Sequence, residues 1–169
     1  GTGAVVVAAN QPGNANWNPA PEVRRTVKVS AARPPIAGIM NADFDGDGLA
    51  DPAVYDERTG TWKVKLSGGG YATAVFTAFL GGPGWLPACA DYDGDGLTDP
   101  AVCQEATGNW KVLQSGSGYA ALQRPAFLGG PGWVPACADY EGDGLADYAV
   151  YQESAGNWQA KLSSAGYGL

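Results

Sequence analysis

The stretch DFDGDGLAD at residues 43–51 returns as DYDGDGLTD at 91–99 and as DYEGDGLAD at 139–147. Positions 1, 3, 5 and 9 of each stretch carry a carboxylate, and glycines at positions 4 and 6 let the backbone turn tightly enough to aim the carboxylates at one point. Asp-Gly turns are also common without a metal. However, four carboxylates in nine residues, with no Lys or Arg among them, would repel one another, so the pattern favours a cation-binding loop.

Calcium is the expected ion. The chain has no His and only three Cys, so the side chains that favour zinc or copper are scarce. Ca²⁺ accepts about six to eight oxygen ligands in flexible geometry, whereas Mg²⁺ prefers a stricter octahedron. Each of the three expected sites uses four carboxylates and the backbone carbonyl at position 7. These ligands are Asp43, Asp45, Asp47, Leu49 and Asp51; Asp91, Asp93, Asp95, Leu97 and Asp99; and Asp139, Glu141, Asp143, Leu145 and Asp147. Because Glu141 replaces an aspartate, we expect the third site to be the weakest.

Composition indicates an ordered, turn-rich protein, with 26 Gly and 12 Pro beside 45% hydrophobic residues among 169. The net charge of −7 argues against nucleic acid or an anionic membrane as a partner. The three loops hold 12 of the 17 acidic residues, so three divalent ions would bring the net charge to about −1. No apolar run is long enough to span a bilayer.

Residues 1–34 differ from the rest and are expected to form an arm of two strands. The apolar run at 4–9 and the partly alternating run at 23–29 are β-prone, and residues 10–21 between them are rich in turn formers. Arg-Pro-Pro at 33–35 is expected to act as a stiff spacer.

From residue 35 the sequence repeats every 48 residues, giving units at about 35–82, 83–130 and 131–169. A period in the forties is typical of propeller blades and other stacked units. We predict an all-β fold in which each unit has four short antiparallel strands, with the acidic loop between the first and second. The third strand begins at Trp62, Trp110 or Trp158, and the fourth spans residues 71–80 or 119–128.

These units resemble the FG-GAP/VCBS repeats, which are integrin-type β-propeller blades with a D-x-D-G-D-G-x-x-D loop. The resemblance covers residues 35–169 and includes the Pro-Ala-Val that follows the loop and the Gly-Asn-Trp turn. It implies calcium in each blade, residence outside the cell or on a bacterial surface, and a role in adhesion or scaffolding. The segment at residues 10–21 resembles the end of bacterial immunoglobulin-like repeats.

Three units are fewer than the four to eight blades, roughly, of a closed propeller. The third unit stops before the residues that would match 122–133, and by the same alignment the strand at residues 26–29 stands where a fourth strand should precede the first unit. We therefore expect head-to-tail assembly of copies by strand donation, giving a homo-oligomer or homopolymer. The competing explanation is that the chain is a fragment of a longer protein.

The cysteines suggest one disulfide. Cys89 and Cys103 flank the second loop, whereas the first unit has a cysteine at neither equivalent position. We expect a Cys89–Cys103 bridge, which leaves Cys137 unpaired. The tryptophans of the repeats are expected to pack in the core or between units rather than bind sugars, while Trp17 lies outside the repeats.

No catalytic residues are expected. Without His there is no Ser-His or Cys-His nucleophile, and the carboxylates that could act as acid and base are those the metal needs. Two functions remain open. One is an extracellular, calcium-stabilised structural or adhesive protein, and the alternative is a carbohydrate-binding module of the propeller-lectin kind.

Overall fold

The computed structural model describes residues 3–11, 20–29, 40–76 and 79–168. These residues are mostly β, and their sheets are antiparallel, which confirms the predicted all-β class. Within these ranges the one short helix is the 3₁₀ turn Ser115–Ser117, and none is long and apolar enough to cross a membrane. The chain divides into two compact units, Gly1–Pro34 and Pro35–Leu169.

The first unit is a hairpin of β1 (Gly3–Gln11) and β2 (Ala20–Val29). The strands pair antiparallel from Gly3 opposite Val29 to Ala9 opposite Val23, which confirms the two predicted strand runs. The predicted loop around Trp17 and the predicted 33–35 spacer lie outside the described residues. A two-stranded sheet of this kind is marginally stable alone, because each strand leaves one edge unpaired.

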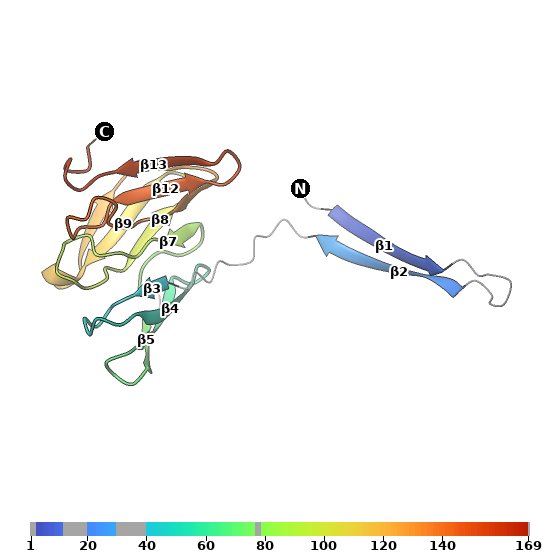
Figure 1. Cartoon of the computed structure of the whole chain (residues 1–169), viewed down its shortest axis with the longest axis horizontal. Coiled ribbons are helices and arrows are strands. Elements are labelled where there is room, and N and C mark those ends of the chain that lie inside the picture. Colours follow the sequence, from blue (N-terminus) through green and yellow to red (C-terminus); the bar gives the residue numbers. More distant parts are fainter. Residues whose placement is uncertain (1–2, 12–19, 30–39, 77–78, 169) are drawn as a thin grey trace. The chain divides into compact units, whose positions relative to one another are not determined.

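The second unit contains three sheets that follow one another along the chain (Figure 1). The first sheet contains β3 (Met40–Ala42), β4 (Asp51–Asp56), β5 (Thr61–Leu66) and β6 (Ala72–Phe76). The second contains β7 (Trp85–Pro87), β8 (Ala101–Gln104), β9 (Asn109–Gln114) and β10 (Ala120–Arg124). The third contains β11 (Trp133–Pro135), β12 (Tyr148–Gln152) and β13 (Asn157–Lys161). Within the described ranges the sheets do not close into a propeller.

Local sequence explains the hairpins between the second and third strands. Gly60 adopts φ 66° and donates its N–H to the Asp56 carbonyl at 2.9 Å, closing a turn that a glycine makes without strain. After it, Thr61–Leu66 alternates in burial because strand side chains point to opposite faces in turn.

The fourth strands are shorter than the predicted 71–80 and 119–128. Tyr71 and Tyr119 have φ of 61° and 63°, so they belong to the preceding turn and the strands begin one residue later. Beyond β10 the chain turns back, and the Phe127 N–H donates to the Gly108 carbonyl at 2.9 Å. In the third sheet β13 has no fourth partner among the described residues, as the alignment predicted.

Two apolar clusters join the sheets. One lies between the first and second sheets around Tyr55, Trp62 and Val102, and the other lies between the second and third around Trp110 and Tyr148. Trp62 and Trp110 are each 1% exposed, and their ring N–H groups donate to the Leu80 and Leu128 carbonyls at 3.1 and 2.9 Å.

Trp158 departs from the expected packing, because 60% of its surface is exposed. In the first two sheets the third-strand tryptophan is covered by the segment after the fourth strand, which supplies the Leu80 or Leu128 carbonyl. No such segment follows β13 in the described part of the chain.

The predicted Cys89–Cys103 disulfide is wrong, because all three cysteines are free. Cys103 lies opposite Leu86 in the β7–β8 ladder, whereas Cys89 lies beyond the end of β7, where its Sγ accepts the Ala101 N–H at 3.4 Å. Cys103 accordingly packs in the cluster with Trp110, and Cys89 packs against the cluster with Trp62. Burial raises the pKa of both thiols to about 12, so neither is an accessible thiolate at neutral pH.

Candidate metal centres

Each acidic loop joins the first strand of a sheet to the second. Its glycines at positions 4 and 6 have positive φ, at 78° and 83° for Gly46 and Gly48, with similar values in the other loops. This conformation turns both N–H groups onto the position 1 carboxylate, and Gly46 and Gly48 donate to Asp43 at 2.6 and 2.9 Å. The same pair of distances recurs at Asp91 and at Asp139. Backbone donors therefore fix the first carboxylate of every loop.

The position 9 aspartate is fully buried in each loop, at 0% exposure for Asp51, Asp99 and Asp147. Asp51 accepts the Phe44 N–H at 2.8 Å and the Ser67 N–H at 2.7 Å, so it ties the loop to the end of β5. Asp99 and Asp147 repeat both bonds. A buried carboxylate is tolerated here because both of its oxygens accept hydrogen bonds.

The pKa values of two of these buried aspartates, Asp51 and Asp99, shift in opposite directions. Burial opposes ionisation of Asp51, but the N–H groups of Ser67 and Phe44 outweigh it and lower the pKa of Asp51. At Asp99, burial dominates over the N–H groups of Ser115 and Tyr92 and raises the pKa.

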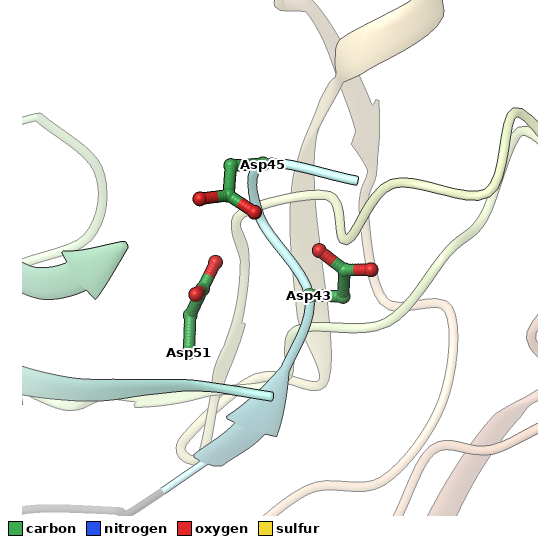
Figure 2. A group of neighbouring side chains, drawn as sticks. All are labelled: Asp43, Asp45 and Asp51. Carbon is green, nitrogen blue, oxygen red and sulfur yellow. The ribbon is translucent and has the colours of Figure 1, made fainter. Parts of the chain in front are cut away.

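Two groups of carboxylates have the geometry of a metal site. Asp43, Asp45 and Asp51 bring carboxylate oxygens within 4.8 Å of one another, and Figure 2 shows the three side chains pointing toward a common space. Asp91, Asp93 and Asp99 form the second group. Either group can hold a metal ion.

One oxygen of the second group has no protein partner. Asp93 Oδ2 accepts the Gly116 N–H at 3.0 Å, whereas Oδ1 is buried and forms no hydrogen bond. A buried carboxylate oxygen without a partner carries a desolvation cost of about 1–3 kcal/mol or more. A cation within the group would supply the missing interaction.

The position 5 aspartates are not members of these groups. Ser67 Oγ lies 2.8 Å from both oxygens of Asp47, and Ser115 Oγ donates to Asp95 at 2.9 Å. The sequence interpretation missed these serines, although Ser67, Ser115 and Ser163 recur at the 48-residue period within two residues of the end of each third strand. Leu49, Leu97 and Leu145 donate their N–H groups to the position 5 carboxylates, and the ligand role of their carbonyls stays a prediction.

The third loop forms no comparable group within the described ranges. The longer Glu141 side chain reaches the end of β13, where it accepts the Ser164 N–H at 2.7 Å and the hydroxyls of Ser163 and Ser164 at 2.8 and 2.6 Å. Asp139, Asp143 and Asp147 keep the backbone contacts of their counterparts. Asp45 and Asp93 accept the equivalent N–H groups of Gly68 and Gly116, so the two serine hydroxyl donors are what distinguishes Glu141.

Successive loops also contact one another. The Thr98 N–H donates to the Asp43 carbonyl at 2.7 Å, and the Ala146 N–H donates to the Asp91 carbonyl at the same distance. The Leu97 side chain lies over Gly46, where an added Cβ would meet it at 2.6 Å, and Leu145 covers Gly94 in the same way at 3.0 Å. At Gly46 and Gly94 an added Cβ would therefore displace the overlying leucine side chain, and the positive φ would strain the substituted residue as well.

Comparison with known proteins gave no match to a family model, a curated protein or a solved structure. The resemblance to FG-GAP/VCBS repeats accordingly rests on the motifs and their spacing.

Proposed function

We propose that this chain is an extracellular, calcium-stabilised structural or adhesive protein of the FG-GAP/VCBS repeat type, whose copies assemble head to tail. The proposal rests above all on the contact that each acidic loop makes with the next. This contact occurs twice within the chain with the same hydrogen bond and the same Leu-on-Gly packing.

Calcium suits the acidic loops because only oxygen ligands converge there. Three carboxylates bring a charge of −3 to each of the two groups, which a divalent ion largely offsets. The two groups are the stronger candidate sites, and the third loop, with Glu141 held by serines, is the weaker one. The ion would fix the loops on which the sheets stack, so its role is structural.

The first and third sheets each leave one half of the loop contact unused, and the two halves are complementary. At the leading end, Leu49 is 58% exposed and Val54 is 40% exposed, whereas the Val102 and Val150 equivalents of Val54 are fully buried. At the trailing end, a Cβ at Gly142 would meet nothing within 4 Å, unlike one at Gly46 or Gly94. Leu49 of one copy can therefore cover Gly142 of another. Such a contact joins unlike surfaces, and without a closing rotation it generates a filament.

Strand donation would complete the third sheet at the same junction. The edge of β13 is unpaired within the described residues, whereas β5 and β9 each pair with a fourth strand there. By the 48-residue alignment, residues 24–28 of β2 correspond to Ala72–Phe76 of β6. The hairpin of another copy would then add β2 to β13, with main-chain hydrogen bonds supplying affinity.

Deleting residues 1–32 tests the assembly. We expect light scattering in millimolar calcium to show a high-mass species for the full chain and a much smaller particle for the truncated chain, because the donated strand is lost. A thermal melt of the truncated chain serves as the folding control. If the folded, truncated chain still forms the same high-mass species, strand donation by this hairpin is wrong.

A further inference from the structure

An apolar pocket of about 200 Å³ lies between the first and second sheets. Its aromatic lining comes from Phe44, Trp62, Phe76, Phe79 and Tyr119, and Pro100 forms part of its wall. No charged side chain lines it. Phe76 and Phe79 contact each other with ring centroids 5.1 Å apart, and Phe79 meets the Tyr119 ring edge-on at 6.4 Å.

The next pair of sheets shows what fills the equivalent space. Tyr148 stands 48 residues after Pro100, and its side chain is 0% exposed. Its ring stacks on Tyr92 with centroids 4.5 Å apart, and it meets Trp110, Phe127 and Tyr167 edge-on at 5.1, 5.0 and 5.0 Å. These four partners are the 48-residue equivalents of Phe44, Trp62, Phe79 and Tyr119. The same aromatic cage thus occurs twice, and only the second copy carries its own ring.

The cages differ at one further position. Arg124 lies over the rings of Phe127, Tyr148 and Tyr167, at 4.8 to 5.3 Å from their centroids. Its equivalent in the first cage is Phe76, so the first cage has an additional aromatic wall in place of a cation. This exchange favours an uncharged occupant, because a buried charge there would have no partner.

We propose that the pocket between the first and second sheets binds a small, uncharged, single-ring aromatic molecule of the phenol class, in the place that the Tyr148 ring takes in the next cage. The size agrees, because an apolar cavity of about 150 Å³ holds a benzene molecule. Offset and edge-on contacts with the surrounding rings would stabilise such a guest beyond the burial of its apolar area. This site is independent of the assembly proposed above.

Titration of p-cresol, the side-chain analogue of tyrosine, tests the site in calcium-loaded full-length protein. We expect saturable binding with a dissociation constant on the order of 1 mM, followed by Trp fluorescence and by NMR. Pro100→Tyr should abolish binding, because the new ring fills the cage as Tyr148 does. Pro52→Tyr is the matched control, since Pro52 occupies the equivalent position in the first sheet, is exposed and does not line the pocket. It should bind p-cresol like the wild type.

A second pair of variants covers the case in which Pro100→Tyr does not fold. Phe76→Ala removes one exposed wall of the cage, and we expect it to weaken binding about fivefold. The neighbouring Val75→Ala removes an exposed side chain that does not line the pocket, and binding should stay within about twofold of the wild type. Absence of saturable binding to the wild type overturns the proposal. Equal binding by folded Pro100→Tyr, or an equal loss in Phe76→Ala and Val75→Ala, also overturns it.

Discussion

Removing calcium with EGTA is expected to lower the melting temperature of the folded chain by about 15 °C. An ion that binds only the folded state at 100 times its dissociation constant stabilises that state by about 2.7 kcal/mol per site. Two occupied groups therefore contribute about 5 kcal/mol, and each kcal/mol shifts the melting temperature by about 3 °C in a unit of this size. Scanning calorimetry in millimolar calcium and in EGTA measures the difference.

Magnesium provides the control for this melt. It prefers a strict octahedron and retains its waters, so it should restore much less of the stability than calcium. An unchanged melting temperature in EGTA would contradict the structural role of the ion. Equal rescue by both ions would contradict the choice of calcium.

Leu49→Asp is expected to break the assembly while leaving each copy folded. The side chain is 58% exposed in the single chain, so its replacement should cost little folding stability. In the proposed junction it would cover Gly142 of the neighbouring copy, and the change would bury an unpaired carboxylate there. We expect the dissociation constant of the junction to rise by more than about 100-fold.

Leu49→Met is the matched control, because it keeps an apolar side chain of similar volume. Analytical ultracentrifugation in calcium should find Leu49→Asp as the smallest species and Leu49→Met as large as the wild type. The loop contact would be the wrong junction if Leu49→Asp sedimented like the wild type.

Much of the fold could be predicted from the sequence because the same pattern of strands and acidic loop occurs three times. Alternation such as that of residues 61–66 marks strands, and the acidic loop marks the connection between the first two strands of each sheet. The fourth strands begin one residue later than predicted because Tyr71 and Tyr119 adopt positive φ, which tyrosine rarely does and which no local pattern indicated.

Side-chain partners across sheets were harder to predict. The sequence interpretation placed Cys89 and Cys103 near each other, but the two side chains pack in different apolar clusters, which depends on contacts between sheets. The sequence interpretation likewise gave Asp45 and Asp47 the same role as metal ligands. The difference arises because Ser67, far along the chain, binds Asp47 and leaves Asp45 grouped with Asp43 and Asp51.

Calorimetric titration of calcium into the metal-free protein counts the calcium sites directly. We expect two stronger sites and one weaker site in the wild type. Asp93→Asn should remove one of the stronger sites, because it removes the charge next to the unpartnered oxygen. Asp95→Asn, at a carboxylate bound by Ser115, should weaken binding less. A wild-type titration without calcium-specific heat, or an Asp93→Asn titration indistinguishable from the wild type, would contradict calcium binding by these carboxylate groups.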